Sequence, residues 1–302
     1  MSFNDNAQLD PGRVRDTRGR SGGKIAAGGG GILVLLLAAL FGINPQILSD
    51  MGLGGAPTSQ EQTQGADGAQ SQDCKTGADA DKRSDCRIIG TVQSLDAFWG
   101  PYLKQYNVSH ANPEINIFSG AVNTGCGQAT SDVGPFYCPA DQTGYFDTGF
   151  FDLLRNQFGA DGGPLAEEYV VAHEYGHHIQ NEIGTLKYSQ SGGTGATSGA
   201  VRVELQADCF AGLWAAYASQ TKDSSGNTFL EPFTEADLKS ALSAASAVGD
   251  DRIQKASTGR VMPEAWTHGS SAQRQAWFLQ GYKTGDINKC NTLQSKDLNT
   301  PS

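Results

Sequence analysis

The stretch that decides the fold is residues 171–178, which read VAHEYGHH. It contains the pattern His-Glu-x-x-His in a run without proline, and apolar residues flank it as in a buried helix. Two histidines four residues apart lie on one helical face, so His173 and His177 are predicted to bind one zinc ion. Glu174 would lie beside that metal, where a carboxylate can take a proton from a bound water.

A catalytic zinc ion needs a third protein ligand and keeps one position open for water. The motif does not continue as His-x-x-Gly-x-x-His, so the third ligand has to come from another segment. Residues 204–208, ELQAD, lie in a second helical run, and their two carboxylates share one helical face. We predict Glu204 as the third ligand and Asp208 as the group that orients a ligand histidine. A solvated carboxylate pair is the alternative, but the neighbouring apolar residues favour burial.

A further polar group usually assists zinc-dependent hydrolysis by stabilising the developing negative charge. His268 is the remaining candidate for this catalytic role, with Tyr145 and Tyr175 behind it. His178 ends the opening stretch and points about 100° away from the preceding histidine, so we expect it to pack or to support the site. His110 lies in a polar stretch and is predicted to have no role.

The overall composition narrows the class of protein. The chain has 302 residues, 22 Lys+Arg and 32 Asp+Glu, which gives a formal charge of -10. An acidic chain without an extended basic cluster is a poor candidate for nucleic-acid binding, so no nucleic-acid partner is expected.

Six cysteines indicate disulfides in an oxidising compartment. The absence of a C-x-x-C pair argues against a cysteine zinc knuckle. We favour the local pairs Cys74–Cys86 and Cys126–Cys138, which leaves Cys209–Cys290. Six free thiols in a cytosolic protein are the alternative.

The N-terminal part carries the pattern of a membrane anchor. Residues 25–43 carry no charge and are long enough to cross a bilayer as a helix. Because arginine and lysine precede them, residues 1–24 are predicted as a cytoplasmic basic tail and the rest as extracytoplasmic. A cleaved signal peptide is the alternative, but no small-residue cleavage site follows. Residues 44–73 are predicted as a flexible linker, and residues 74–302 as a zinc metallopeptidase domain.

Residues 74–302 are predicted to form a mostly helical domain with a small sheet, an α+β fold. The expected strands are 115–118, 136–138 and 144–147. The expected helices are 95–106, 150–158, 164–184, 200–220, 235–248 and 271–282.

Five sequence blocks, in this order, resemble a bacterial family of neutral zinc metallopeptidases. The blocks are SGAVNTGCG at 119–127, GPFYCPAD at 134–141, HEYGHH at 173–178, ELQADCFAG at 204–212 and HGSSAQR at 268–274. The resemblance covers about residues 86–286 and implies an N-terminal membrane anchor followed by a zincin-type protease fold of the gluzincin kind.

The same resemblance implies His173, His177 and Glu204 as zinc ligands and Glu174 as the catalytic glutamate. In zincins generally, an edge strand above the motif helix receives the substrate backbone. By that analogy, residues 115–121 would form this strand.

The predicted function is that of a membrane-anchored endopeptidase with one Zn²⁺ per chain and a peptide or protein substrate. One alternative is a non-catalytic, zinc-stabilised binding module outside the cytoplasm. Another is a zinc amidase that acts on cell-wall cross-links, because the metal chemistry would be the same. The sequence specifies neither the physiological substrate nor the oligomeric state.

Overall fold

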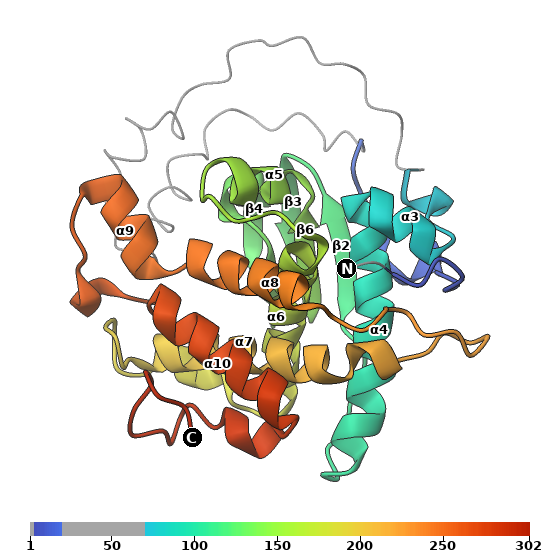
Figure 1. Ribbon diagram of the computed structural model, residues 1–302. Coiled ribbons are helices and arrows are strands. Elements are labelled where there is room, and N and C mark those ends of the chain that lie inside the picture. Colours follow the sequence, from blue (N-terminus) through green and yellow to red (C-terminus); the bar gives the residue numbers. More distant parts are fainter. Residues whose placement is uncertain (1–2, 20–69) are drawn as a thin grey trace, which may run out of the picture.

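The computed structural model describes residues 3–19 and 70–302, whose fold is α+β and mostly helical, as the sequence predicts (Figure 1). Its strands are β1 (Arg15–Asp16), β2 (Glu114–Phe118), β3 (Ala121–Thr124), β4 (Gly127–Thr130), β5 (Phe136–Cys138) and β6 (Thr143–Asp147). Its α-helices are α3 (Gly77–Lys82), α4 (Ser84–Lys104), α5 (Gly149–Asn156), α6 (Pro164–Glu182), α7 (Gly199–Tyr217), α8 (Glu235–Ala247), α9 (Asp250–Thr258) and α10 (Ser271–Thr284).

The main sheet has the order β1-β2-β6-β5, and β3 and β4 form a separate pair. β2 runs parallel to β6, and β5 runs antiparallel to β6 on its other side. β1 pairs with β2 in parallel, with Arg15 opposite Asn116. β2 is therefore an inner strand, and the prediction that residues 115–121 form a free edge strand is wrong. The N-terminal segment occupies that edge, and among the described strands of this sheet β5 is the other edge.

The motif helix α6 runs through the interior and contacts α4, α7 and α8. Proline at its first position fits the start of a helix, because its missing N–H would have no helical partner there. Gly184, just beyond the helix, has φ +75°, a conformation that favours glycine. Because other helices surround α6, they enclose the polar side chains of the motif.

Helices α7 and α10 approach each other unusually closely. A Cβ atom at Gly212 would lie 1.9 Å from the carbonyl oxygen of Phe278, and one at Gly281 would lie 1.9 Å from that of Cys209. Only glycine therefore fits at these two crossing points. The close crossing brings α10 side chains to the same buried region as those of α6 and α7.

Helix α4 begins at Ser84, well before the start predicted at residue 95. Its first half contains Ile88, Ile89 and Val92, whose branched side chains lower helix propensity. All three are buried in the core, so packing against neighbouring elements stabilises a helix that the local pattern does not indicate. The short elements α3, α9, β1, β3 and β4 were also not predicted.

The N-terminal region differs from the prediction. Residues 3–19, which the sequence pattern places in a tail apart from the domain, pack against it, and Phe3 is 1% exposed. The predicted anchor at residues 25–43 and most of the predicted linker lie outside the described residues. Within residues 3–19 and 70–302, no helix has both the length and the apolar character that a bilayer crossing requires.

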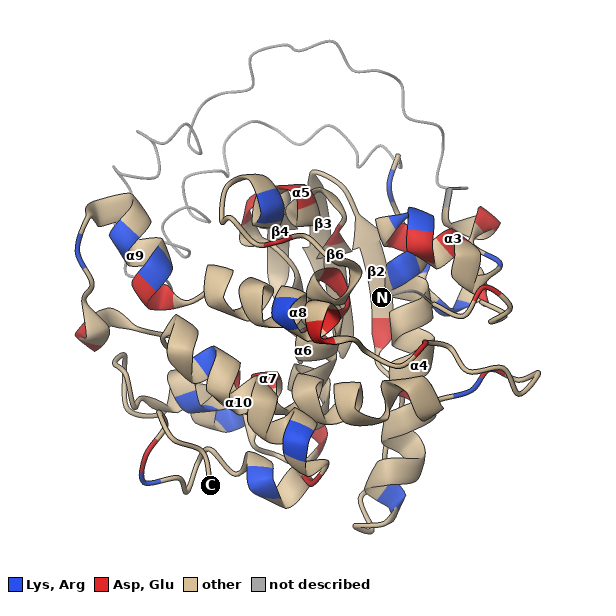
Figure 2. Cartoon of the chain, in the orientation of Figure 1, with Lys and Arg blue, Asp and Glu red and all other residues tan. Residues whose placement is uncertain are grey.

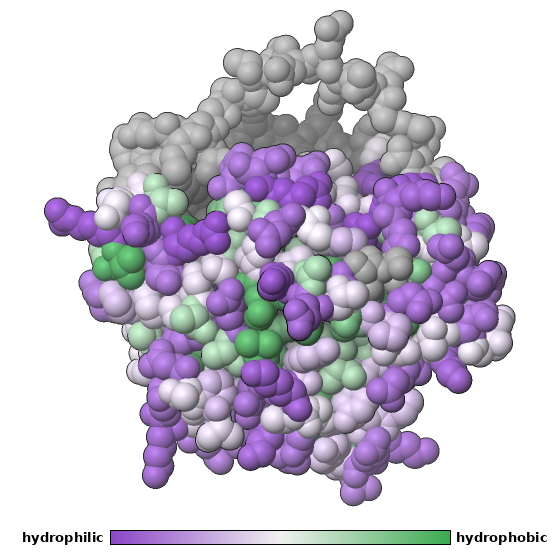
Figure 3. Space-filling view, viewed as in Figure 1, coloured by the Kyte–Doolittle hydropathy of each residue, from purple (hydrophilic) through white to green (hydrophobic). Residues whose placement is uncertain are grey.

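On the side of the molecule that Figures 2 and 3 show, acidic and basic residues are interspersed over the helices. Apolar patches on this side are small, and polar surface separates them (Figure 3).

The three disulfides are those favoured from the sequence: Cys74–Cys86, Cys126–Cys138 and Cys209–Cys290. The third joins α7 to the short 3₁₀ helix at Ile287–Cys290, and both of its cysteines are fully buried. It closes a loop of 81 residues, whereas each of the others closes one of 12.

Loop length predicts unequal contributions of these bridges to stability. In the chain-entropy model, replacing Cys209 and Cys290 by serine should lower the free energy of unfolding by about 4.5 kcal/mol, against about 3 kcal/mol for Cys126 and Cys138. Urea unfolding of the two double variants measures the difference. An equal loss, or a larger one for the short loop, would contradict the expectation.

Candidate metal centre

Helices α6 and α7 bring together the three predicted zinc ligands. The Nε2 atom of His173 lies 3.2 Å from one Glu204 carboxylate oxygen, and that of His177 lies 3.5 Å from the other. The ligating atoms of all three residues lie within 4.8 Å of one another. Two imidazole nitrogens and one carboxylate form a donor set that is found in catalytic zinc sites.

A hydrogen-bond partner at the Nδ1 atom of each imidazole ring sets the orientation of that ring. The Nδ1 atom of His173 lies 2.8 Å from Asp208 Oδ1, and that of His177 lies 2.7 Å from Gln180 Oε1. Because each Nδ1 has its own partner, the Nε2 lone pairs are directed toward the space next to Glu204. The residues present therefore fit a zinc ion.

Glu174 follows the first ligand and is 9% exposed. Burial raises the pKa of its carboxyl to about 7, and the nearby charge of Glu204 adds to this effect. Glu204 itself shows the opposite shift: although burial opposes ionisation, interaction with His177 and the hydrogen bond with His173 hold the pKa of its carboxyl well below the usual range. The two carboxylates differ because of their partners.

Asp208 is completely buried and receives hydrogen bonds from two other helices. On α6, the Tyr169 hydroxyl donates to Oδ1 at 2.5 Å, beside the contact from His173. On α10, the Arg274 guanidinium donates through Nε at 2.9 Å and through Nη2 at 3.0 Å. Burial alone would raise the pKa of Asp208, but Arg274 and His173 lower it to about 2. Asp208 is therefore ionised and can hold the His173 ring in place.

His268 precedes α10, and a positive charge on its ring would lower the pKa values of both Glu174 and Glu204. Its Nδ1 lies 3.3 Å from Asp250 Oδ1 and 2.9 Å from the hydroxyl of Thr267. The other Asp250 oxygen accepts backbone N–H groups from residues 267–269 at 2.7–2.9 Å. Although burial opposes it, the pKa of His268 is raised, chiefly by its hydrogen bond to Asp250.

Both tyrosines considered with His268 make their contacts elsewhere. Tyr145 lies in β6 and donates to Asp141 at 2.7 Å. Tyr175 points to the opposite side of α6, where it donates to Asp96 at 3.0 Å. Neither contact brings the phenol to the group of His173, His177 and Glu204.

The other two histidines belong to a separate polar network. His178 contacts the Tyr137 hydroxyl through Nδ1 and the Ala111 carbonyl oxygen through Nε2, so it does not join the ligand set. His110, which was predicted to have no role, lies 2.6 Å from a Glu182 oxygen. These contacts fix the face of α6 that points away from the proposed ligands.

The sequence pattern of one protein family matches residues 4–293, and the family carries the description "Putative neutral zinc metallopeptidase". The chain belongs to this family. Among its relatives is "Uncharacterized protein Rv2575" of Mycobacterium tuberculosis, 56% identical over 234 residues, which cover 77% of this chain and 78% of that protein. "Uncharacterized protein YpfJ" of Escherichia coli is 36% identical over 293 residues, which cover 93% of this chain and 95% of that protein. No solved structure gives a significant match.

In this member of the zinc metallopeptidase family, sequence reasoning did not find Tyr169, Asp250 or Arg274. Arg274 ends the block that begins at His268, and this shared block was the one available signal for it. Asp250 is an acidic residue at a helix start, a common position that does not indicate a role in a site. Tyr169 precedes the motif by one turn and resembles any other buried aromatic residue.

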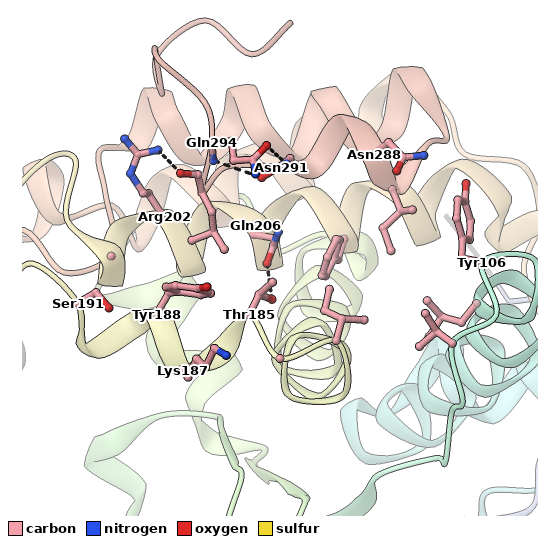
Figure 4. Close-up of a pocket in the computed structure, with 18 of the residues that line it drawn as sticks. Tyr106, Thr185, Lys187, Tyr188, Ser191, Arg202, Gln206, Asn288, Asn291 and Gln294 are labelled. Carbon is pink, nitrogen blue, oxygen red and sulfur yellow. Dashed lines mark hydrogen bonds between the residues drawn. The ribbon is translucent and has the colours of Figure 1, made fainter.

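A cavity of about 860 Å³ lies on another part of the domain (Figure 4). Arg202 and Gln206 line it from α7, and Thr185 donates a hydrogen bond to Gln206 at 2.8 Å. Arg202 lies two residues before Glu204 and Gln206 two residues after it. Their side chains therefore point away from the face of α7 that carries Glu204. None of the proposed zinc ligands lines this cavity, so we do not assign it to the reaction.

The contact between Asp208 and His173 leads to a prediction about metal affinity. Asp208→Asn should weaken zinc binding by roughly 10- to 100-fold, because the amide no longer supports the ring as an anion does. Competition with a chromophoric chelator measures the affinity. Asp152→Asn, at a side chain that is 68% exposed, is the control and should leave the affinity unchanged. Equal affinities in the two variants would refute the role of Asp208.

Proposed function

We propose that this chain is a zinc-dependent endopeptidase with one zinc ion held by His173, His177 and Glu204. The observation that carries the proposal is the convergence of both Nε2 atoms on the Glu204 carboxylate, with the buried Glu174 next to His173 in the motif helix. Bound zinc would act as a Lewis acid and lower the pKa of a bound water to about 7.

The chain's own residues would move the protons and stabilise the charge. Glu174, enclosed and with its pKa raised to about 7, would take a proton from the attacking water and deliver it to the departing amine. His268, held by Asp250, would donate to the oxyanion that forms on the peptide carbonyl. Asp208 would keep the His173 ring oriented, and Arg274 would keep Asp208 in place.

We further propose that the domain works outside the cytoplasm. The three disulfides support this proposal, because such bridges persist in oxidising compartments. Attachment to a membrane through residues 25–43 remains a prediction from the sequence, because those residues lie outside the described part of the chain.

The first test is Glu174→Gln, which keeps the shape of the side chain and removes its basicity. We expect zinc binding to persist and cleavage of a peptide library to fall by roughly 10²- to 10⁴-fold. Zinc content by atomic absorption and cleavage by mass spectrometry provide the two readouts. If wild type and variant cleave peptides equally poorly, the protein is not a peptidase. Release of cell-wall fragments by the wild type alone would then indicate an amidase, and no activity would indicate a binding module.

The second test concerns His268. His268→Ala should lower kcat by about 10²- to 10³-fold and leave KM nearly unchanged, because the proposed contact forms only as the oxyanion develops. Asp250→Asn should give a smaller loss, since the ring remains but is held less firmly. Steady-state kinetics on one peptide substrate measures both effects. A change confined to KM would assign His268 to substrate binding and contradict the proposed role.

A further inference from the structure

The N-terminal segment, residues 3–19, is built into the core of the domain. Its apolar side chains are enclosed, with exposed fractions between 0% and 6%: Phe3, Ala7, Leu9 and Val14. All four belong to the same core cluster as the buried residues of α6 and α7. This degree of enclosure is typical of an integral element of a fold and not of a loosely attached tail.

The rest of the domain leaves a fitted space for this segment. A Cβ atom at Gly90 on α4 would lie 2.5 Å from Phe3 Cε1, and one at Gly77 on α3 would lie 2.0 Å from the Asn4 carbonyl oxygen. Glycine at these two positions therefore allows the chain to pass. At both positions the nearest atoms that a side chain would meet belong to Phe3 and Asn4.

Backbone hydrogen bonds connect residues 3–19 to the rest of the domain at several points. Leu9 N–H donates to the Lys75 carbonyl at 2.9 Å, and Gly77 N–H donates to the Ala7 carbonyl at 3.0 Å. β1 completes the sheet along β2, and the next residue, Thr17, donates to the Ile117 carbonyl at 2.9 Å. The segment thus covers an edge that would otherwise expose unpaired strand groups.

Ion pairs connect the segment to α4 and, through α4, to the motif helix. The Nη2 atom of Arg18 lies 2.7 Å from Asp85 Oδ2, and the Nε atom of Arg13 lies 2.6 Å from Asp96 Oδ2. The Asp96 carboxylate also accepts the Tyr175 hydroxyl at 3.0 Å. Tyr175 stands next to Glu174 in the motif, so one carboxylate links the N-terminal segment to the helix of the proposed zinc site.

We propose that residues 3–19 are a constant part of the folded domain and lie on the same side of any membrane as residues 70–302. A single crossing by residues 25–43 would put the two parts on opposite sides and remove β1 and Phe3 from their places. The docked segment therefore excludes the single-pass arrangement that the charge pattern predicts. This inference goes beyond the proposed function and does not depend on peptidase activity.

Introduced cysteines in the full chain test the proposal, because all six native cysteines are bonded to one another. Arg15→Cys and Lys283→Cys, both at exposed positions, are made separately and treated in intact cells with a membrane-impermeant maleimide. We expect both thiols to react from the same side. Labelling after lysis shows that each thiol is reactive.

A double variant tests the docking itself. Arg15→Cys with Asn116→Cys joins neighbours across β1 and β2, and residues paired in a sheet are close enough for a disulfide. After mild oxidation, mass spectrometry should find the cross-linked peptide in most chains, and Arg15→Cys with Lys283→Cys should give none. Labelling from opposite sides, or the absence of the cross-link, would overturn the proposal. The single-cysteine labelling decides the topology even if the double variant does not fold.

Discussion

The buried carboxylate of Asp208 is the constraint on which the rest of the site depends. It lies on α7, and its partners are Tyr169 and His173 on α6 and Arg274 on α10. Removing a carboxylate from water costs several kcal/mol unless charges and hydrogen bonds replace the lost hydration. The three helices must therefore keep one mutual register, because a shift of α6 or of α10 relative to α7 would remove part of the hydrogen bonding that this charge needs. The glycine contacts between α7 and α10 allow the approach that the Arg274 contact requires.

The same arrangement separates the roles of three carboxylates near the proposed metal centre, of which Asp208 and Glu174 are buried and Glu204 is partly exposed. Asp208 has a guanidinium beside it and stays ionised, and Glu204 faces two imidazoles and does the same. Within the described part of the chain, no cationic side chain lies at hydrogen-bond distance from Glu174, so burial dominates and raises the pKa of its carboxyl to about 7. A group that exchanges a proton near neutral pH is thus placed next to groups that do not. The difference comes from neighbours and not from the type of side chain.

Local sequence patterns predict those parts of the site that depend on helical spacing. His173 with His177, and Glu204 with Asp208, are each four residues apart, and the structure brings the four together from two adjacent helices. Arg274 lies 66 residues from Asp208, and no local pattern links the two. The same holds for the sheet. β1 lies about a hundred residues before β2, and two residues of strand give no periodic signal, so the free edge was assigned to the wrong strand.

The rotation of α6 about its own axis is fixed by polar contacts on two different faces. On one side His177 faces Glu204, and on the other His178 contacts the Ala111 carbonyl and the Tyr137 hydroxyl. Consecutive residues on a helix differ by about 100° in direction, so a rotation of that size would move one of the two histidines into the surroundings of the other. It would also remove the buried His178 imidazole from its partners, at a cost of about 1–3 kcal/mol for each unsatisfied group. The network behind the helix therefore helps to position the proposed zinc ligands, although it touches none of them.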